Sequence, residues 1–128
     1  EQKALVHWLS LHPILKRFFC RITNEGKRSP VTGLHLKLEG LRPGVSDLFI
    51  YYPVGQYSGL WLEMKRNKKY TISERNTDTW IAQEKFQETV KSIGYAAFFC
   101  YGCDHGMKVI SNYLSGSPVV DLNLLKLP

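Results

Sequence analysis

The chain has 128 residues, 44% of them hydrophobic and 22% charged, which is the composition of one ordinary globular domain and excludes a disordered or fibrous protein. No apolar run approaches the roughly 20 residues that a membrane-spanning helix requires, and no signal peptide is visible, so we expect no membrane partner. Seventeen lysine and arginine residues against eleven acidic residues give a net charge of +6, which favours polyanionic partners but does not by itself indicate nucleic acid.

The opening segment predicts an amphipathic helix that ends before Pro13. Its apolar residues recur at helical spacing and are Ala4, Leu5, Trp8, Leu9 and Leu11. Residues 17–23 have the composition of a strand, and residues 24–30 form a polar turn that contains glycine and proline.

Residues 32–40 fit either a short helix or a strand, because Leu34, Leu36 and Leu38 alternate with other residues. After a breaker-rich turn, residues 47–52 and 60–66 both predict strands. A short polar loop joins them, so the simplest arrangement is an antiparallel hairpin.

The second half of the chain predicts a helix, a strand and a last helix. Thr77, Asp78 or Thr79 can cap the first helix, which ends at Gly94. Its expected apolar stripe is Ile81, Phe86, Val90 and Ile93. Residues 95–102 form an almost continuously apolar strand, as in a strand covered on both faces, and residues 103–116 form the last helix. This order of elements predicts an α/β sandwich with a central mixed sheet flanked by helices.

Three cysteines, an odd number, do not make a disulfide framework and indicate a reducing compartment. Cys100 and Cys103 form a Cys-x-x-Cys with His105 just beyond, which could be a zinc half-site or a redox pair. No second ligand pair stands at the spacing of a zinc finger. We therefore favour the simpler interpretation that the two cysteines are small apolar residues at the end of a strand.

Glu63 and Lys65 lie within the otherwise apolar segment "GLWLEMKR", and residues two apart on a strand share a face. They could form a simple ion pair. If the two central strands pair, however, Asp47 converges with Glu63, and two adjacent carboxylates need a cation between them. Mg²⁺ is usually held by one or two carboxylates, and the backbone carbonyl of Met64 could add a ligand. Lys65 could then help to activate a water or balance charge on a phosphate, so the group has the parts for hydrolysing a phosphodiester.

Three segments in this order resemble the VRR nuclease domain, the virus-type replication-repair branch of the PD-(D/E)xK nuclease superfamily. They are "GLRPGVSDLFI", "GLWLEMKR" and a helix that carries Gln83 and ends at "IGYAAFF". The segments "EQKALVHWL", "NEGKRS" and "GMKVISNYL" resemble the family's opening helix, turn and closing helix. The resemblance implies a nuclease domain over residues 1–116 with a restriction-endonuclease-like fold, and leaves residues 117–128 as an apolar tail for docking or dimerisation.

The resemblance also implies a role for each matching residue. Asp47 and Glu63 would bind Mg²⁺ or Mn²⁺ together with the Met64 carbonyl, Lys65 would be the catalytic lysine, and Gln83 the polar residue that the helix turns toward the site. Glu1 corresponds to a first-helix glutamate that completes the acidic cluster. Gln87, one turn further along, is the alternative to Gln83, and Gly44 would be a turn glycine that lets the backbone place Asp47.

Basic residues gather in two loops beside this acidic centre, where a polyanionic backbone would need them. The expected nucleic-acid-binding residues are Asn24, Lys27, Arg28, Arg66, Lys68, Lys69 and Tyr70. By resemblance, the protein is expected to be a DNA endonuclease of repair or recombination that resolves Holliday (four-way) junctions as a homodimer, in the host cytoplasm if its source is a virus or phage. A nuclease for flaps, nicks or duplex DNA, or a non-catalytic DNA-binding module, are the alternatives. Residues 34–41 and 119–127 are the candidate dimer surfaces, although residues 34–41 could equally be buried within the monomer.

Overall fold

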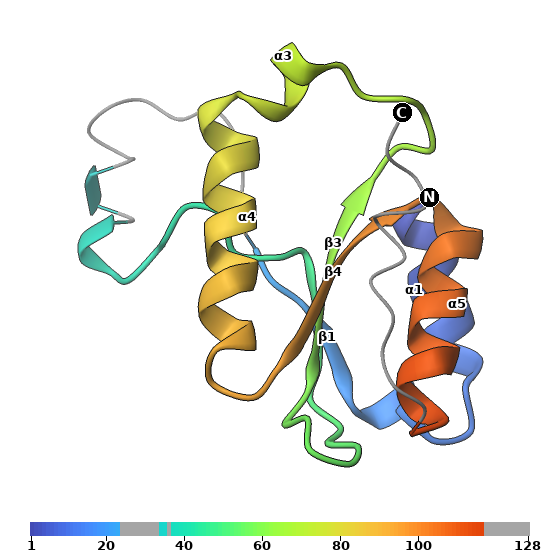
Figure 1. The fold of residues 1–128 in the computed structure, drawn as a ribbon. Helices are drawn as coiled ribbons and strands as arrows, with labels where there is room; N and C mark the ends of the chain where they lie inside the picture. The colour runs from blue at the N-terminus through green and yellow to red at the C-terminus, as the bar shows by residue number, and fades with distance from the viewer. Residues whose placement is uncertain (24–33, 36, 117–128) are drawn as a thin grey trace.

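The computed structural model describes residues 1–23, 34–35 and 37–116, which form a four-stranded sheet with helices on both faces (Figure 1). The strands stand in the order β1 (Phe19–Arg21), β2 (Leu48–Ile50), β3 (Leu60–Lys65) and β4 (Ala96–Tyr101). β1 and β2 are antiparallel, as are β2 and β3, whereas β3 and β4 are parallel. The predicted mixed sheet and its central hairpin are therefore confirmed.

Helices α1 (Gln2–Leu11) and α5 (Cys103–Leu114) cover one face of the sheet, and α4 (Asp78–Lys91) covers the other (Figure 1). The alternation of a strand assigns the residues of β3 to these two faces. Leu60 and Leu62 belong to the main core on the α1 and α5 side. The residues between and after them, Trp61, Glu63 and Lys65, therefore face α4.

The main core joins α1, α5 and the sheet through side chains with no exposed surface. They include Leu5, Leu9, Leu48, Leu60, Leu62 and Ile110. Each fully buried leucine or isoleucine stabilises the fold by about 1.5–3 kcal/mol. Tyr113 also brings its ring into this core, and its hydroxyl donates a hydrogen bond of 2.7 Å to the carbonyl of Tyr52. The α4 face has a smaller apolar cluster, made by Trp80, Phe99 and Tyr101 with Tyr70 against it.

The predicted apolar faces of two helices are only partly right. In α1, Leu5 and Leu9 are buried as expected, but Ala4 is exposed and Leu11 is 71% exposed. The apolar stripe predicted for the next long helix was wrong at Ile81, which is in α4 and 48% exposed, and at Ile93, which lies just after the end of α4 and is 67% exposed. The buried residues of α4 are Trp80, Gln87 and Val90. This helix turns a face with polar residues toward the sheet, which hydrophobic periodicity does not detect.

Other local differences have local causes. The first strand is shorter than the predicted segment 17–23, because Leu15–Arg17 form a 3₁₀ turn. The short helix α3 (Ile72–Arg75) was not predicted, although a capping box in which Thr71 and Glu74 bond each other's backbone N–H groups marks its start. In the ambiguous segment 32–40, the described residues 34–35 and 37–38 are helical, and the side chains of Leu34 and Leu38 are exposed.

The predicted turn 24–30 and the apolar tail 117–128 lie outside the described residues, as does Leu36. None of the helices in the described part of the chain has the length and apolar character that a membrane crossing requires.

Candidate active site

Asp47 and Glu63 lie opposite each other across the central hairpin. The register pairs Leu48 with Leu62. Asp47, which immediately precedes β2, therefore lies opposite Glu63, which follows Leu62 in β3. Both side chains belong to the α4 face, where the next cross-strand pair, Phe49 and Trp61, stacks with ring centroids 4.2 Å apart. The sequence prediction that the hairpin brings the two carboxylates together is consistent with this geometry.

Asp47 also completes the hydrogen bonding of β3. This strand continues beyond the start of β2, so the N–H of Met64 has no strand carbonyl opposite it. Oδ2 of Asp47 accepts that hydrogen bond at 2.9 Å. Because the N–H and C=O of one strand residue point to the same side of the strand, the carbonyl of Met64 is also directed toward Asp47.

Glu63 is the most unusual group of the site, because it is only 4% exposed and its Oε1 has no hydrogen-bond partner among the described residues. Burial and then the adjacent carboxyl of Asp47 raise the pKa of Glu63 to about 9, against an opposing effect of Lys65. Without a cation, Glu63 therefore holds a proton at neutral pH. A buried carboxyl oxygen without a partner, beside a second carboxylate, is a donor set that suits a hard divalent cation.

Lys65 lies on the same face as Glu63 and meets α4. Its Nζ donates a hydrogen bond of 2.5 Å to Oε1 of Gln83 and lies 4.4 Å from the ring centroid of Trp80. Burial lowers the pKa of Lys65, whereas the charges of Glu63 and Asp47 raise it. A half-buried lysine with a lowered pKa beside carboxylates is typical of a functional site.

The helix α4 contributes three side chains to this region. Gln83 faces the sheet and meets Lys65, as the sequence had predicted for a polar residue at this position. Gln87, one turn later, is 4% exposed, and its Nε2 has no hydrogen-bond partner among the described residues. Trp80, which the sequence analysis did not select, forms the wall under Lys65 and stacks on Phe99 at 5.0 Å. The only feature of the sequence that could have indicated a role for Trp80 is its position one turn before Gln83 on the same helix.

Gly44 joins the loop before Asp47 to the helix of Gln83. Its φ of +83° favours glycine, and a Cβ at this position would collide with the backbone carbonyl of Ala82 and lie 2.9 Å from the nitrogen of Gln83. The predicted turn glycine thus also permits a direct backbone contact between the loop and α4. A side chain at this position would therefore push the loop away from α4.

Glu1 lies apart from the two carboxylates. It stands just before the first residue of α1, where its side chain makes no capping hydrogen bond, and it lines a cavity of about 580 Å³ beside Asn67, Gly102 and Cys103. Gly102 in turn donates a hydrogen bond of 3.0 Å to the carbonyl of Lys65, so Glu1 is at the same end of the sheet as the site. No cluster of three or more His, Cys, Asp or Glu side chains suited to a metal occurs among the described residues. A role for Glu1 as a metal ligand therefore remains a prediction.

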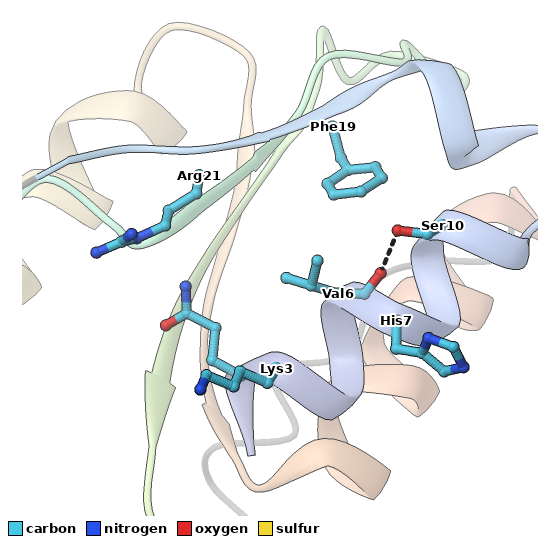
Figure 2. Close-up of a pocket in the computed structure, with 7 residues that line it drawn as sticks. Lys3, Val6, His7, Ser10, Phe19 and Arg21 are labelled. Atoms are coloured by element: carbon cyan, nitrogen blue, oxygen red, sulfur yellow. Dashed lines mark hydrogen bonds between the residues drawn. The ribbon is translucent and has the colours of Figure 1, made fainter.

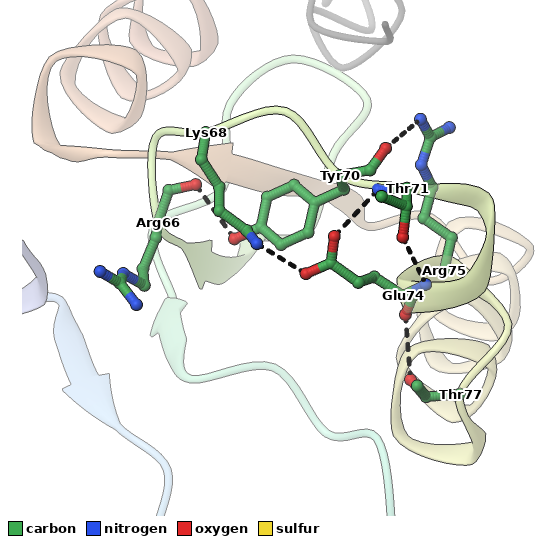
Figure 3. A network of polar contacts seen from close by, with 7 residues as sticks. All are labelled: Arg66, Lys68, Tyr70, Thr71, Glu74, Arg75 and Thr77. Carbon is green, nitrogen blue, oxygen red and sulfur yellow. Dashed lines mark hydrogen bonds and ion pairs between the residues drawn. The ribbon is translucent and has the colours of Figure 1, made fainter.

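The loop after β3 holds four of the residues predicted to bind nucleic acid, and two of them are engaged in the fold (Figure 3). Lys68 forms an ion pair of 2.6 Å with Glu74. Tyr70 packs its ring on Trp80, and its hydroxyl donates to the carbonyl of Arg66 at 3.1 Å. The side chain of Arg66 points away from this network, and Lys69 is exposed. The other predicted contacts, Asn24, Lys27 and Arg28, lie outside the described residues.

The Cys-x-x-Cys segment supports the apolar interpretation. Cys100 is fully buried in the main core, and its burial raises the pKa of its thiol. Cys103 begins α5 as a partly buried thiol whose pKa is also raised, chiefly by burial. His105 accepts a hydrogen bond of 2.9 Å at Nδ1 from the backbone N–H of Tyr101 and so fastens α5 to the end of β4. Thiols of raised pKa are poor nucleophiles and poor metal ligands.

Comparison with known proteins identifies the fold that this arrangement of strands and helices forms. No family model matches the sequence, and no curated protein matches it. A solved structure described as a "VRR_NUC domain protein" superimposes with a TM-score of 0.73 over 91% of this chain and 86% of that chain, at 22% sequence identity. The chain therefore has the VRR-NUC fold, an α/β sandwich of the kind that the sequence motifs had predicted.

Proposed function

We propose that this protein, whose chain has the VRR-NUC fold, is a divalent-metal-dependent DNA endonuclease that resolves four-way junctions. The observation that supports it most is the meeting of Asp47, Glu63 and Lys65 on one face at the end of the central hairpin. A buried carboxyl next to a second carboxylate and a half-buried lysine is costly to a fold, and a structural role would be met more simply by apolar residues.

Asp47, Glu63 and the carbonyl of Met64 would hold Mg²⁺ or Mn²⁺. The partnerless Oε1 of Glu63 and the half-exposed carboxyl of Asp47 support this choice. When bound, such a cation polarises a phosphate oxygen and lowers the pKa of a coordinated water. Glu1 is a further candidate ligand from the same end of the sheet. It would have to turn from Gly102 toward Asp47.

Lys65 would act on the water and the phosphate. In hydrolysis a bond forms between the water oxygen and phosphorus, the bond from phosphorus to the 3′ oxygen breaks, and a 5′-phosphate is released. Lys65, whose pKa is lowered by burial, would help to deprotonate this water or would balance the charge on the phosphate. Gln83 would orient Lys65 through the hydrogen bond between them, and the ring of Trp80 would limit its movement.

Junction cleavage requires two cuts in opposed strands, which a symmetric homodimer supplies with two copies of one site. The exposed side chains of Leu34 and Leu38, at 58% and 77%, support residues 34–41 as a contact surface between the two copies. Arg66 and Lys69 are the described cations of the β3 loop that remain available to phosphates. The apolar segment 119–127 is a second candidate for the dimer contact.

The test is cleavage of a labelled four-way junction and of a linear duplex of the same sequence, with Mg²⁺, Mn²⁺ or EDTA. Wild type, Glu63→Ala and Lys65→Ala are compared. Metal-dependent paired nicks in the junction that both substitutions abolish would support the proposal. Cutting of duplex or flaps instead would retain the site and overturn the substrate. Tight binding with no cleavage in either metal would overturn the chemistry.

A further inference from the structure

A groove runs between α1 and the edge strand β1, on the face of the sheet opposite α4 (Figure 2). Its volume is about 680 Å³. The residues that line it are Gln2, Lys3, Val6, His7, Ser10, Phe19 and Arg21. The site around Glu63 uses none of these residues, and none of them was given a role by the sequence analysis, although four lie in its opening segment "EQKALVHWL".

The lining combines an aromatic ring with cationic side chains. Phe19 and Val6 face each other across the groove, while Lys3 and Arg21 extend from its two walls at the same end (Figure 2). Lys3, His7 and Arg21 are exposed, and no acidic residue is among the described residues that line the groove. The hydroxyl of Ser10 is used within α1, where it donates a hydrogen bond of 2.8 Å to the carbonyl of Val6. The basic side chains of the lining, Lys3 and Arg21, are therefore the groups placed to contact an anion.

The cationic end of the groove lies next to the strand that carries Asp47. Arg21 pairs with Leu48 in the sheet, and the N–H of the following residue, Ile22, donates to the carbonyl of Asp47 at 2.8 Å. Because β1 is at the edge of the described sheet, a chain that leaves the site can pass around this edge into the groove. Its path would run from the carboxylates on one face to Lys3 and Arg21 on the other.

We propose that this groove binds a single strand of DNA next to the cleavage site, with a base stacked on Phe19 and phosphates held by Lys3 and Arg21. A cationic rim around an aromatic floor is the combination that recognises unpaired nucleotides, since an unpaired base can reach the ring and a base inside a duplex cannot. The inference rests on the proposed nuclease function and adds one requirement to it: the junction must present unpaired nucleotides beside the cut, at the point where its strands separate.

The test uses the Glu63→Gln protein in EDTA, so that binding is measured without cleavage. A labelled oligothymidylate of about 12 nucleotides is titrated by fluorescence anisotropy, and so is a duplex of the same length. The double substitution Lys3→Glu with Arg21→Glu is expected to weaken single-strand binding about tenfold or more and to lower the salt slope by roughly 1.4, which is two phosphate contacts. Lys85→Glu with Lys91→Glu, exposed on α4, is the charge-matched control and is expected to change the affinity less than about twofold.

A second substitution separates stacking from charge. Phe19→Leu keeps the floor apolar and is expected to weaken single-strand binding about fivefold with the salt slope unchanged. The neutral double variant Lys3→Gln with Arg21→Gln guards against misfolding of the charge reversal, and thermal unfolding checks both.

Three results would overturn the inference: an equal loss in the Lys85 and Lys91 control, an equal loss for duplex, or no effect of Phe19→Leu and the double variants. A peptide of residues 117–128 is also added to the complex with the oligonucleotide. If the peptide displaces no oligonucleotide, DNA remains the occupant of the groove; if it does displace the oligonucleotide, the groove binds the tail and the inference is overturned. Cleavage by the wild type with Mg²⁺ is assayed in parallel. If the wild type cleaves DNA but the groove variants bind single strands normally, only the inference about the groove is contradicted. If the wild type never cleaves DNA, the proposed nuclease function is contradicted.

Discussion

The two faces of the central sheet differ in what they bury. On the α1 and α5 side, Leu60 and Leu62 pack in a core of apolar side chains that includes Tyr113. On the α4 side, the same strand contributes Glu63 and Lys65, and the helix contributes Gln83 to the same place. The α1 and α5 face therefore stabilises the fold by burying apolar side chains. The α4 face lowers the stability in part, because it holds polar groups away from water. Adjacent residues of β3 offer a way to test this division, because Leu62 and Glu63 point to opposite faces.

The largest expected effect is on catalysis at the α4 face. Glu63→Gln and Lys65→Met should each lower the rate of DNA cleavage by about 10³-fold or more, because each removes a group placed at the reacting phosphate. Single-turnover cleavage with Mg²⁺ measures this loss. Near-normal rates in either variant, with the protein folded by circular dichroism, would remove that residue from the proposed machinery.

The matched substitution on the opposite face should act on stability. Leu62→Ala removes a fully buried side chain and should lower the free energy of unfolding by about 3 kcal/mol. Urea unfolding measures this change, and Leu11→Ala, at a side chain 71% exposed, is the control expected within about 0.5 kcal/mol of wild type. The folded fraction of Leu62→Ala should keep its cleavage rate. A large catalytic loss there would show that the two faces are not separable.

The raised pKa of Glu63 predicts how stability depends on pH in EDTA. The folded protein holds the proton of Glu63 up to about pH 9, whereas the unfolded chain releases it near 4.5, so the fold loses stability as pH rises between these values. Glu63→Gln cannot lose this proton and should therefore be more stable than wild type at pH 8.5, and the four pH units above 4.5, at about 1.4 kcal/mol each, set an upper limit of about 5 kcal/mol on the difference.

Asp47 and Lys65 face Glu63 and remain in both proteins, so the comparison isolates one carboxyl. Thermal unfolding at pH 5 and pH 8.5 measures the difference. Equal stabilities at pH 8.5 would mean that Glu63 is ionised in the fold without a cation. Added Mn²⁺ should stabilise wild type more at pH 8.5 than at pH 5, because binding displaces the proton.

The smallest expected effect concerns the helix that orients Lys65. Gln83→Ala should lower the cleavage rate about tenfold with little change in KM, because the hydrogen bond to Lys65 is lost while the DNA contacts remain. Gln83→Glu, which can still accept the hydrogen bond, should recover part of the rate. A change confined to KM would instead place Gln83 in DNA binding.

Much of this arrangement could be predicted from local sequence. The strand pattern of residues 60–66 and the polar link before it predicted the hairpin, and the hairpin brings Asp47 to Glu63. The face of α4 could not be predicted in the same way. A rule that equates buried with apolar selected Ile81 and Ile93, which are exposed, and passed over the buried Gln87.

The sequence by itself determined the order of the strands and of the three long helices, the mixed sheet and the identity of the charged pair on β3, because alternation, capping and turn residues act over a few positions. Only the tertiary structure decided which surface of α4 meets the sheet, that Gly44 lets the loop of Asp47 touch that helix, and that Lys3 and Arg21 come to one end of a groove. These are contacts between residues far apart in the chain. Their geometry depends on how whole elements pack, and no local pattern in the sequence carries it.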